Sequence, residues 1–177
     1  MGHFLDLKSL EDFADNATNE FAKFGVQFNL SPERLVADNF GIDNLCWSHI
    51  PYGRDQIEEV PNDRRGVYAF VICYENGILP PHNYVMYIGI AGRNSNRTLR
   101  ERYRDYLNER VVCKRPKIAR MIGTWHSVLC FYFASVDEEI DSSALETIEK
   151  ALNSALIPPF SQRDIDIELK QKRSAFQ

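Results

Sequence analysis

Two apolar runs with a short polar stretch between them constrain the fold more than any other feature of the chain. Residues 66–74 read GVYAFVICY and residues 84–90 read YVMYIGI, and both runs are rich in the β-branched and aromatic residues that favour strands. The stretch 75–83 contains an Asn-Gly and a Pro-Pro pair, which are typical of turns. The two runs therefore predict an antiparallel hairpin. Residues 125–136, WHSVLCFYFASV, predict a third strand.

Helical patterns follow the hairpin. Residues 98–110 and 114–123 each predict a helix, the second with a proline near its start. A longer helix is expected to begin at Ser143 as N-cap, with Glu146 completing a capping box. Residues 164–172 predict a last helix. The expected fold class is α/β (α+β), with a small three-stranded antiparallel-containing sheet flanked by helices.

The first third of the chain has a different character. Apolar residues repeat at helical spacing over residues 5–24, and Ser31 is placed to begin a second, short helix. Residues 42–63 are irregular, and we interpret them either as a packed connector or as a partial strand. The sequence thus predicts an acidic, mainly helical N-terminal appendage at 1–63 and the main domain at 64–177.

Charge is divided in the same way. Residues 1–63 hold 4 Lys/Arg and 12 Asp/Glu, whereas residues 64–177 hold 17 Lys/Arg and 13 Asp/Glu. Within 93–120 there are 10 Lys/Arg against 3 Asp/Glu. Such a basic block inside a folded segment is typical of a protein that binds a polyanion.

The cysteines indicate neither a zinc knuckle nor a disulfide framework, because no two of them are closely spaced. They are Cys46, Cys73, Cys113 and Cys130. Reduced cysteines are typical of cytoplasmic (intracellular) proteins. We also expect no membrane association, because no apolar run approaches the roughly 20 residues that span a bilayer.

One carboxylate stands out on the helix that begins at Ser143. Glu149 falls inside the apolar face, between Leu145 and Leu152. A carboxylate turned toward a core needs a cationic partner. That partner could be a divalent metal ion or an arginine in a structural salt bridge, and periodicity alone favours neither.

Arg102 and two tyrosines are the other candidates. Arg102 lies at the margin of the apolar face of its helix, where its stem can be buried and its guanidinium held in place. Tyr68 and Tyr87 lie in the two strands of the hairpin, where most tyrosines serve packing.

Read in order, these segments resemble the GIY-YIG nuclease family. Residues 66–68 (GVY) and 87–89 (YIG) are similar to its paired tripeptides. Residues 99–106 (LRERYRDY) look like its arginine helix, and residues 149–160 look like its glutamate helix with a proline-aromatic exit. The resemblance covers about 64–163, and its spacing is most similar to that of the catalytic domain of bacterial excision-repair endonucleases.

The resemblance implies a DNA endonuclease and roles for four residues. Glu149 would hold a divalent cation, Mg²⁺ or Mn²⁺, and Arg102 would hold the scissile phosphate. Tyr68 could act as a general base if the nearby positive charge lowers the pKa of its phenol, which is ordinarily near 10. Tyr87 would orient the water or the phosphate.

Other residues would assist. Tyr106 and Ser161 match accessory positions, although the family usually has Asn where this chain has Ser161. Ile90 stands where a basic residue is sometimes found after the YIG tripeptide. Seven basic residues would contact the DNA backbone: Arg97, Arg100, Arg104, Lys114, Arg115, Lys117 and Arg120.

Two functions fit this pattern. The first is a metal-dependent endonuclease that hydrolyses phosphodiester bonds in DNA. The second is a catalytically weakened or inactive module that keeps the fold for binding nucleic acid or a protein, and a protein partner or self-association is compatible with either. The acidic first third could also cover the basic groove as a mimic of DNA.

Overall fold

The structure is a computed structural model, and it describes residues 7–35, 45–74, 82–93, 95–137 and 139–161. The predicted turn at 75–83 lies largely outside the described residues. The predicted helix at 164–172 lies entirely outside them.

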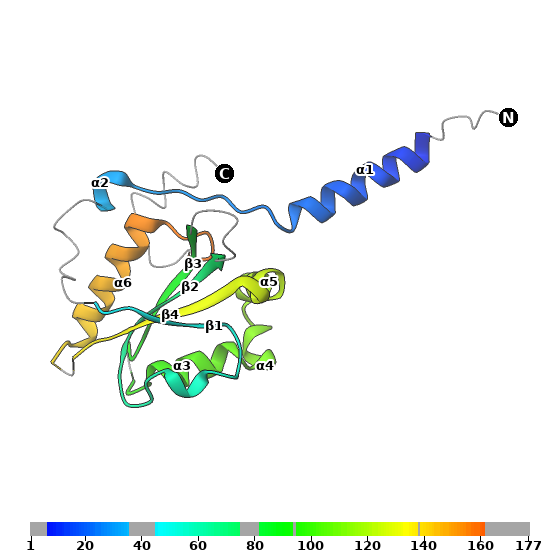
Figure 1. Cartoon of the computed structure of the whole chain (residues 1–177). Coiled ribbons are helices and arrows are strands. Elements are labelled where there is room, and N and C mark those ends of the chain that lie inside the picture. The colour runs from blue at the N-terminus through cyan, green and yellow to red at the C-terminus, as the bar shows by residue number, and fades with distance from the viewer. Residues whose placement is uncertain (1–6, 36–44, 75–81, 94, 138, 162–177) are drawn as a thin grey trace.

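One antiparallel sheet of four strands, in the order β1-β4-β2-β3, organises the fold (Figure 1). The strands are β1 (Ser48–Pro51), β2 (Gly66–Tyr74), β3 (His82–Ala91) and β4 (Leu129–Ser135). The antiparallel pairing of β2 with β3 confirms the predicted hairpin, and β4 confirms the third strand. The prediction of three strands is wrong by one, because β1 also pairs with β4.

β1 is a short strand with little sequence signal. It reads SHIP, and only Ile50 among its four residues is buried. A run this short, ending in proline, shows no alternation that would predict a strand. Of the two interpretations of residues 42–63, the partial strand is confirmed for this segment.

The register of the hairpin brings the two predicted tyrosines to one face of the sheet. Phe70 pairs with Tyr87, and Tyr68, two residues before Phe70, pairs with Gly89. Residues two apart on a strand share a face, so Tyr68 and Tyr87 are diagonal neighbours. A Cβ on Gly89 would lie 2.5 Å from the hydroxyl oxygen of Tyr68. The glycine of the YIG tripeptide therefore makes room for the Tyr68 ring.

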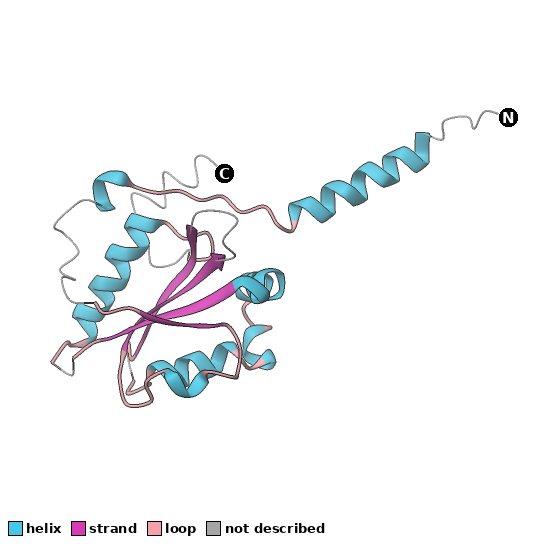
Figure 2. Ribbon diagram, viewed as in Figure 1, coloured by secondary structure: helices cyan, strands magenta, loops and turns pink. Residues whose placement is uncertain are grey.

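The described helices are α1 (Leu7–Ala22), α2 (Pro32–Leu35), α3 (Leu99–Tyr106), α4 (Glu109–Val112), α5 (Pro116–Trp125) and α6 (Ser142–Leu156), with short 3-10 turns at Ile57–Glu59 (η2) and His126–Val128 (η3). Helices lie on both faces of the sheet (Figure 2). Tyr68 on one face packs with Tyr103 of α3 and Met121 of α5. On the other face, Val67 packs with Leu145 of α6.

Three predicted boundaries differ from the structure. The helix predicted at 98–110 is two helices, α3 and α4, because Asn108 caps a new helix by accepting a hydrogen bond from the Arg110 N–H. The third strand begins at Leu129 because α5 continues through Trp125. The N-cap of α6 is Asp141 rather than Ser143, since the Asp141 carboxylate accepts from the Ala144 N–H at 2.7 Å. An acidic cap is favoured by the helix dipole.

The end of the described chain is fastened to β3. The Phe160 N–H donates to the Met86 carbonyl at 3.0 Å. The Ser161 hydroxyl accepts from the Ile88 N–H at 2.9 Å and lies 3.2 Å from the Ile88 carbonyl, to which it donates. Ser161 is 3% exposed, so one side chain satisfies both buried backbone groups of Ile88.

Replacing Ser161 with alanine is expected to lower the free energy of unfolding by about 1–3 kcal/mol, because the Ile88 N–H and carbonyl lose their partner in a buried place. Urea denaturation of wild type and variant measures the change. Ser135→Ala is the matched control, since Ser135 is an exposed serine at the end of β4. Equal losses in the two variants would contradict the role given to the Ser161 hydroxyl.

The N-terminal segment reaches away from the sheet. Figure 1 shows α1 extending from the body of the protein, and Phe13 and Phe21 on this helix are 72% and 83% exposed. Within the range predicted as an appendage, however, β1 belongs to the sheet and Val60 to the core.

Two expectations about the chain as a whole can be compared with the structure. All four cysteines are free. No helix in the described part of the chain has the length and apolar character needed to cross a membrane.

Candidate active site

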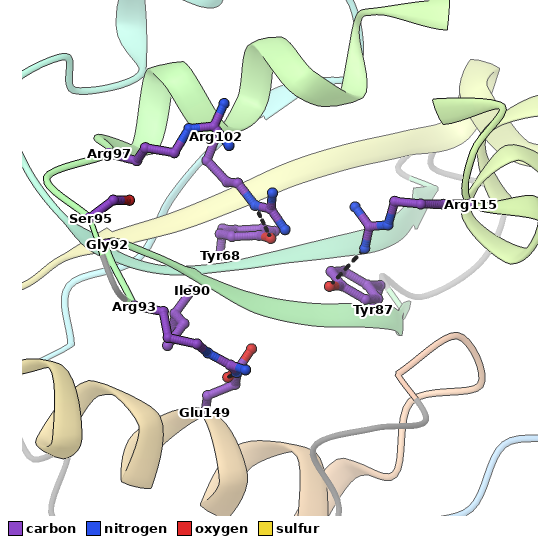
Figure 3. A pocket seen from close by; sticks show the side chains of 10 residues that line it. All are labelled: Tyr68, Tyr87, Ile90, Gly92, Arg93, Ser95, Arg97, Arg102, Arg115 and Glu149. Atoms are coloured by element: carbon purple, nitrogen blue, oxygen red, sulfur yellow. Dashed lines mark hydrogen bonds and ion pairs between the residues drawn. The ribbon is translucent and has the colours of Figure 1, made fainter. Parts of the chain in front are cut away.

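A polar cleft of about 420 Å³ lies between side chains from β2, β3, α3, α6 and the residue before α5 (Figure 3). It is lined by Tyr68, Tyr87, Ile90, Gly92, Arg93, Ser95, Arg97, Arg102, Arg115 and Glu149. The four residues predicted to carry the chemistry are all in this set, although each comes from a different element. Four arginines and one carboxylate line the cleft, which makes it strongly cationic.

Tyr68 and Arg102 form the centre of the cleft. The Tyr68 side chain is fully buried, and its hydroxyl accepts a hydrogen bond from the Arg102 Nε at 3.0 Å. The Tyr106 hydroxyl lies 2.7 Å from the same oxygen. Arg102 and Tyr106 are four residues apart on α3 and therefore lie on one side of it. A capping box between Thr98 and Glu101 fixes the start of this helix.

The Arg102 guanidinium is also held from the side of the cleft. Its Nη1 is 3.2 Å from the Asp105 carboxylate, which in turn accepts from Arg97 at 2.9 Å. These contacts fix the plane of the guanidinium before any ligand binds. Within the described contacts, Arg102 uses two of its five N–H donors, so others remain for a ligand.

Tyr87 has an arginine partner of its own. The Arg115 Nη2 donates to the Tyr87 hydroxyl at 3.1 Å, and the guanidinium lies 5.6 Å from the Tyr87 ring centroid and 5.1 Å from that of Tyr106. Figure 3 shows the two pairs, Arg102 with Tyr68 and Arg115 with Tyr87, side by side. Arg115 was predicted as one of seven general contacts to DNA, but the structure places it inside the cleft.

Glu149 reaches the cleft from α6, which packs on the opposite face of the sheet from α3. Its side chain is 4% exposed, and its Oε2 accepts from the Arg93 Nη2. The Arg93 Nε also lies 3.5 Å from the carboxylate of Glu146. Of the two partners left open for Glu149, the structure shows an arginine.

Burial keeps both tyrosines of the cleft protonated. Burial raises the pKa of the Tyr68 phenol well above its ordinary value, Tyr106 and Tyr87 raise it further, and only the Arg102 charge lowers it. Burial and the neighbouring Tyr106 likewise raise the pKa of Tyr87, against the charge of Arg115. At neutral pH these groups are therefore neutral phenols that donate and accept hydrogen bonds.

The free energy of unfolding is expected to fall as the pH rises above about 10, the ordinary pKa of tyrosine. Burial raises the pKa of Tyr52, Tyr68 and Tyr87, and it raises that of Tyr103 to about 12. Below pH 10 both states keep these protons, but above it the unfolded chain releases them first. Urea denaturation from pH 8 to pH 11 measures the decline, which Tyr68→Phe should make shallower. A midpoint that does not change with pH would contradict these shifts.

The other predicted DNA contacts differ in where they lie. Arg97 lines the cleft, whereas Arg104, Lys114 and Lys117 are exposed and do not line it. Arg100 has a structural task, because it donates to the Val60 carbonyl at 2.7 Å and pairs with the Glu58 carboxylate, which ties α3 to η2.

Arg120 holds the N-terminal segment rather than the cleft. It donates to the backbone carbonyls of Ala22, Lys23 and Gly25 at 3.1–3.3 Å. None of the residues described between 7 and 35 lines the cleft. The idea that the acidic first third covers this groove therefore finds no support in the described residues 7–35, and it stays a prediction.

Sequence reasoning missed Arg93 and Ser95. Arg93 lies just after β3 and follows Gly92, whose φ of +94° is a conformation that favours glycine. The excess of positive charge over 93–120 includes Arg93 but does not distinguish it from the other arginines. Its significance comes from the contact with Glu149, which only the fold reveals.

The donors in the cleft fit a magnesium ion better than a zinc ion. Glu149 is the single carboxylate among the lining residues, and no group of three or more His, Cys, Asp or Glu residues suited to a metal ion was found in the described residues. Mg²⁺ keeps several water ligands and commonly takes one or two carboxylates together with phosphate oxygens. Structural zinc requires four protein ligands. The cleft thus suits a cation shared between Glu149, water and a phosphate.

Comparisons of the chain with protein-family models, with curated proteins and with solved structures found no match. The resemblance to GIY-YIG nucleases therefore depends on the motif residues and on the cleft in which they meet.

Proposed function

We propose that this protein is a metal-dependent endonuclease of the GIY-YIG type that hydrolyses phosphodiester bonds in DNA. One observation carries the proposal: Tyr68, Tyr87, Arg102 and Glu149, from four elements, line one cationic cleft. An ordinary core would not bring a buried and a partly buried phenol, a fixed guanidinium and a buried carboxylate to one open space. A phosphodiester substrate is the ligand that suits such a set. Free cysteines suit a cytoplasmic setting.

Arg102 would bind the scissile phosphate. Its Nε is held by Tyr68 and its Nη1 by Asp105, so its remaining N–H donors form a fork that needs no rearrangement. Such preorganised donors stabilise the charge that develops on phosphate oxygens in the transition state. The guanidinium cannot lose its proton at any working pH. Arg97 and Arg115 would bind the phosphates that flank the scissile one on the DNA strand.

Tyr68 would act first as a hydrogen-bond donor. Its oxygen accepts from Arg102, so its own proton points toward Tyr106 or into the cleft. A neutral phenol can donate to a phosphate oxygen or orient a water molecule. It can accept a proton only when further positive charge offsets the burial that raises its pKa. Tyr87, held by Arg115, would orient the same water or phosphate from the other side.

Glu149 would hold the divalent cation, Mg²⁺ or Mn²⁺. Bound there, such an ion supplies Lewis-acid stabilisation and lowers the pKa of its water. The carboxylate is nearly fully buried, so it is fixed in position and little screened by solvent.

The direct test is cleavage of supercoiled, branched and single-stranded DNA in Mg²⁺ and in EDTA, with Glu149→Ala protein prepared in parallel as the blank. We expect nicking that requires Mg²⁺ and is absent in the blank. Equal residual cleavage in both proteins would contradict the proposal.

A second candidate function is a binding module that has lost activity. It is favoured by two observations: the Glu149 carboxylate is paired with Arg93, and the Ser161 hydroxyl is engaged with Ile88. Binding of DNA without cleavage of any of the three substrates would support this alternative.

A further inference from the structure

Glu149 already has a cation. Its carboxylate is 4% exposed, and a carboxylate at such depth is costly unless it is paired. The Arg93 Nη2 binds its Oε2, while the Arg93 Nε faces Glu146 at 3.5 Å. The Arg93 side chain is itself 41% exposed. The partly exposed Arg93 guanidinium thus lies over the buried Glu149 carboxylate and also contacts the Glu146 carboxylate at the rim of the cleft.

We propose that Arg93 is a positioning residue that occupies Glu149 until a divalent cation replaces it. This inference rests on the proposed function, because it takes Glu149 as the metal ligand. The Arg93 Nη2 binds Oε2, one of the two oxygens that a cation could use, so a cation that approaches this oxygen is repelled by the guanidinium already there. We expect Arg93 to give up this contact, wholly or in part, when a metal ion binds Oε2.

The pairing has a use in the free protein. Without Arg93, the buried Glu149 carboxylate would lose this cationic partner, which costs stability. With Arg93 in place, the Glu149 carboxylate is paired while it lines the cleft. The side chain is thus kept in a state that can bind metal, at the expense of a weaker apparent affinity for it.

The cleft and its rim offer the Arg93 guanidinium other partners once it leaves Glu149. It lines the same cleft as Arg97 and Arg102, and Glu146 at the rim is 48% exposed and can keep hold of its Nε. A released guanidinium in this position is available to a phosphate oxygen. Metal and DNA are therefore expected to bind cooperatively, since each favours the arrangement in which Arg93 no longer covers Glu149.

The test is the dissociation constant of Mn²⁺ for the full chain without DNA, measured by titration calorimetry. Arg93→Ala is expected to bind Mn²⁺ about tenfold more tightly than wild type, because a competing charge-assisted contact is gone. Arg97→Ala is the matched control: it removes the same charge from the same cleft, but Arg97 pairs with Asp105 and not with Glu149. It should change the constant by about twofold or less, because its guanidinium does not compete for the Glu149 carboxylate and its charge is already offset by Asp105.

Thermal melts with and without Mn²⁺ provide a second measurement if Arg93→Ala is too unstable for calorimetry. Without metal this variant should melt below wild type, and Mn²⁺ should raise its Tm more than it raises that of wild type. Arg93→Lys, which keeps a point charge without the fork, should fall between the two.

The outcomes separate the two ideas. If Glu149→Gln abolishes Mn²⁺ binding but Arg93→Ala binds no more tightly than Arg97→Ala, the Arg93 inference is wrong and the proposed metal site stands. If Glu149→Gln binds Mn²⁺ as well as wild type does, the proposed metal site is wrong, and the inference falls with it.

Discussion

Glu149→Ala is expected to lower the rate of DNA cleavage by about 10³-fold or more, because among the described residues it supplies the only carboxylate that lines the cleft. The fold should survive the change. Arg93, the partner left behind, is 41% exposed and can be solvated. Single-turnover nicking of a plasmid at saturating Mg²⁺ measures the rate, and a thermal melt shows whether the protein is folded.

Glu146→Gln is the control for this experiment. Glu146 lies one turn earlier on α6, contacts the same Arg93 and is half-exposed, but it does not line the cleft. Its loss should leave the rate within about threefold of wild type, as for an exposed ion pair. If the two variants lose activity equally, Glu149 acts through Arg93 and not as a ligand.

Arg102→Ala is expected to lower the rate by about 10²–10³-fold, the usual cost of removing one preorganised donor to a transition state. The reason lies in the contacts that fix the guanidinium: Tyr68 on Nε and Asp105 on Nη1. The loss should appear mainly in kcat, because the fork is aimed at charge that grows during the reaction. Steady-state cleavage of a labelled duplex separates kcat from KM.

Two further variants sharpen this prediction. Arg102→Lys keeps the charge but loses the fork, so most of the activity should still be lost. Arg104→Ala removes an exposed arginine from the same helix that does not line the cleft, so it should raise KM with little change in kcat. A loss of kcat in Arg104→Ala as large as that in Arg102→Ala would contradict the assignment.

Local sequence signals were enough for the hairpin and for most helices. The β-branched and aromatic runs of β2 and β3 predict strands without information from the rest of the chain, and the spacing of apolar residues in α6 predicts a helix in the same way. β1 is different, because SHIP has no strand pattern and becomes a strand only where β4 offers Phe131 as a partner for Ile50. Ile50 pairs with a residue 81 positions away, which local propensity does not represent.

Some residues of the candidate site could be predicted from the sequence and others could not. Tyr68, Tyr87, Arg102 and Glu149 could be selected because each stands in a motif at a defined place on an element. Arg93 and Arg115 could not be distinguished from other arginines in a basic stretch. Arg115 precedes α5 by one residue, and only the packing of α5 turns it toward Tyr87. The opposite error occurred for Arg100. It was predicted to contact DNA because it is an arginine on the same helix as Arg102, but it binds the backbone at the end of η2 instead.

The contact between the end of the described chain and β3 also protects an edge strand of the sheet against self-association. β3 and β1 are the two outermost strands of the sheet, and unpaired backbone groups on such strands can recruit strands from other chains. β1 is short and ends in Pro51, which blunts that side. On the other side, Phe160 and Ser161 occupy the outward-facing groups of Met86 and Ile88. A chain cut before Phe160 would leave this strand, which carries Tyr87, open to aggregation.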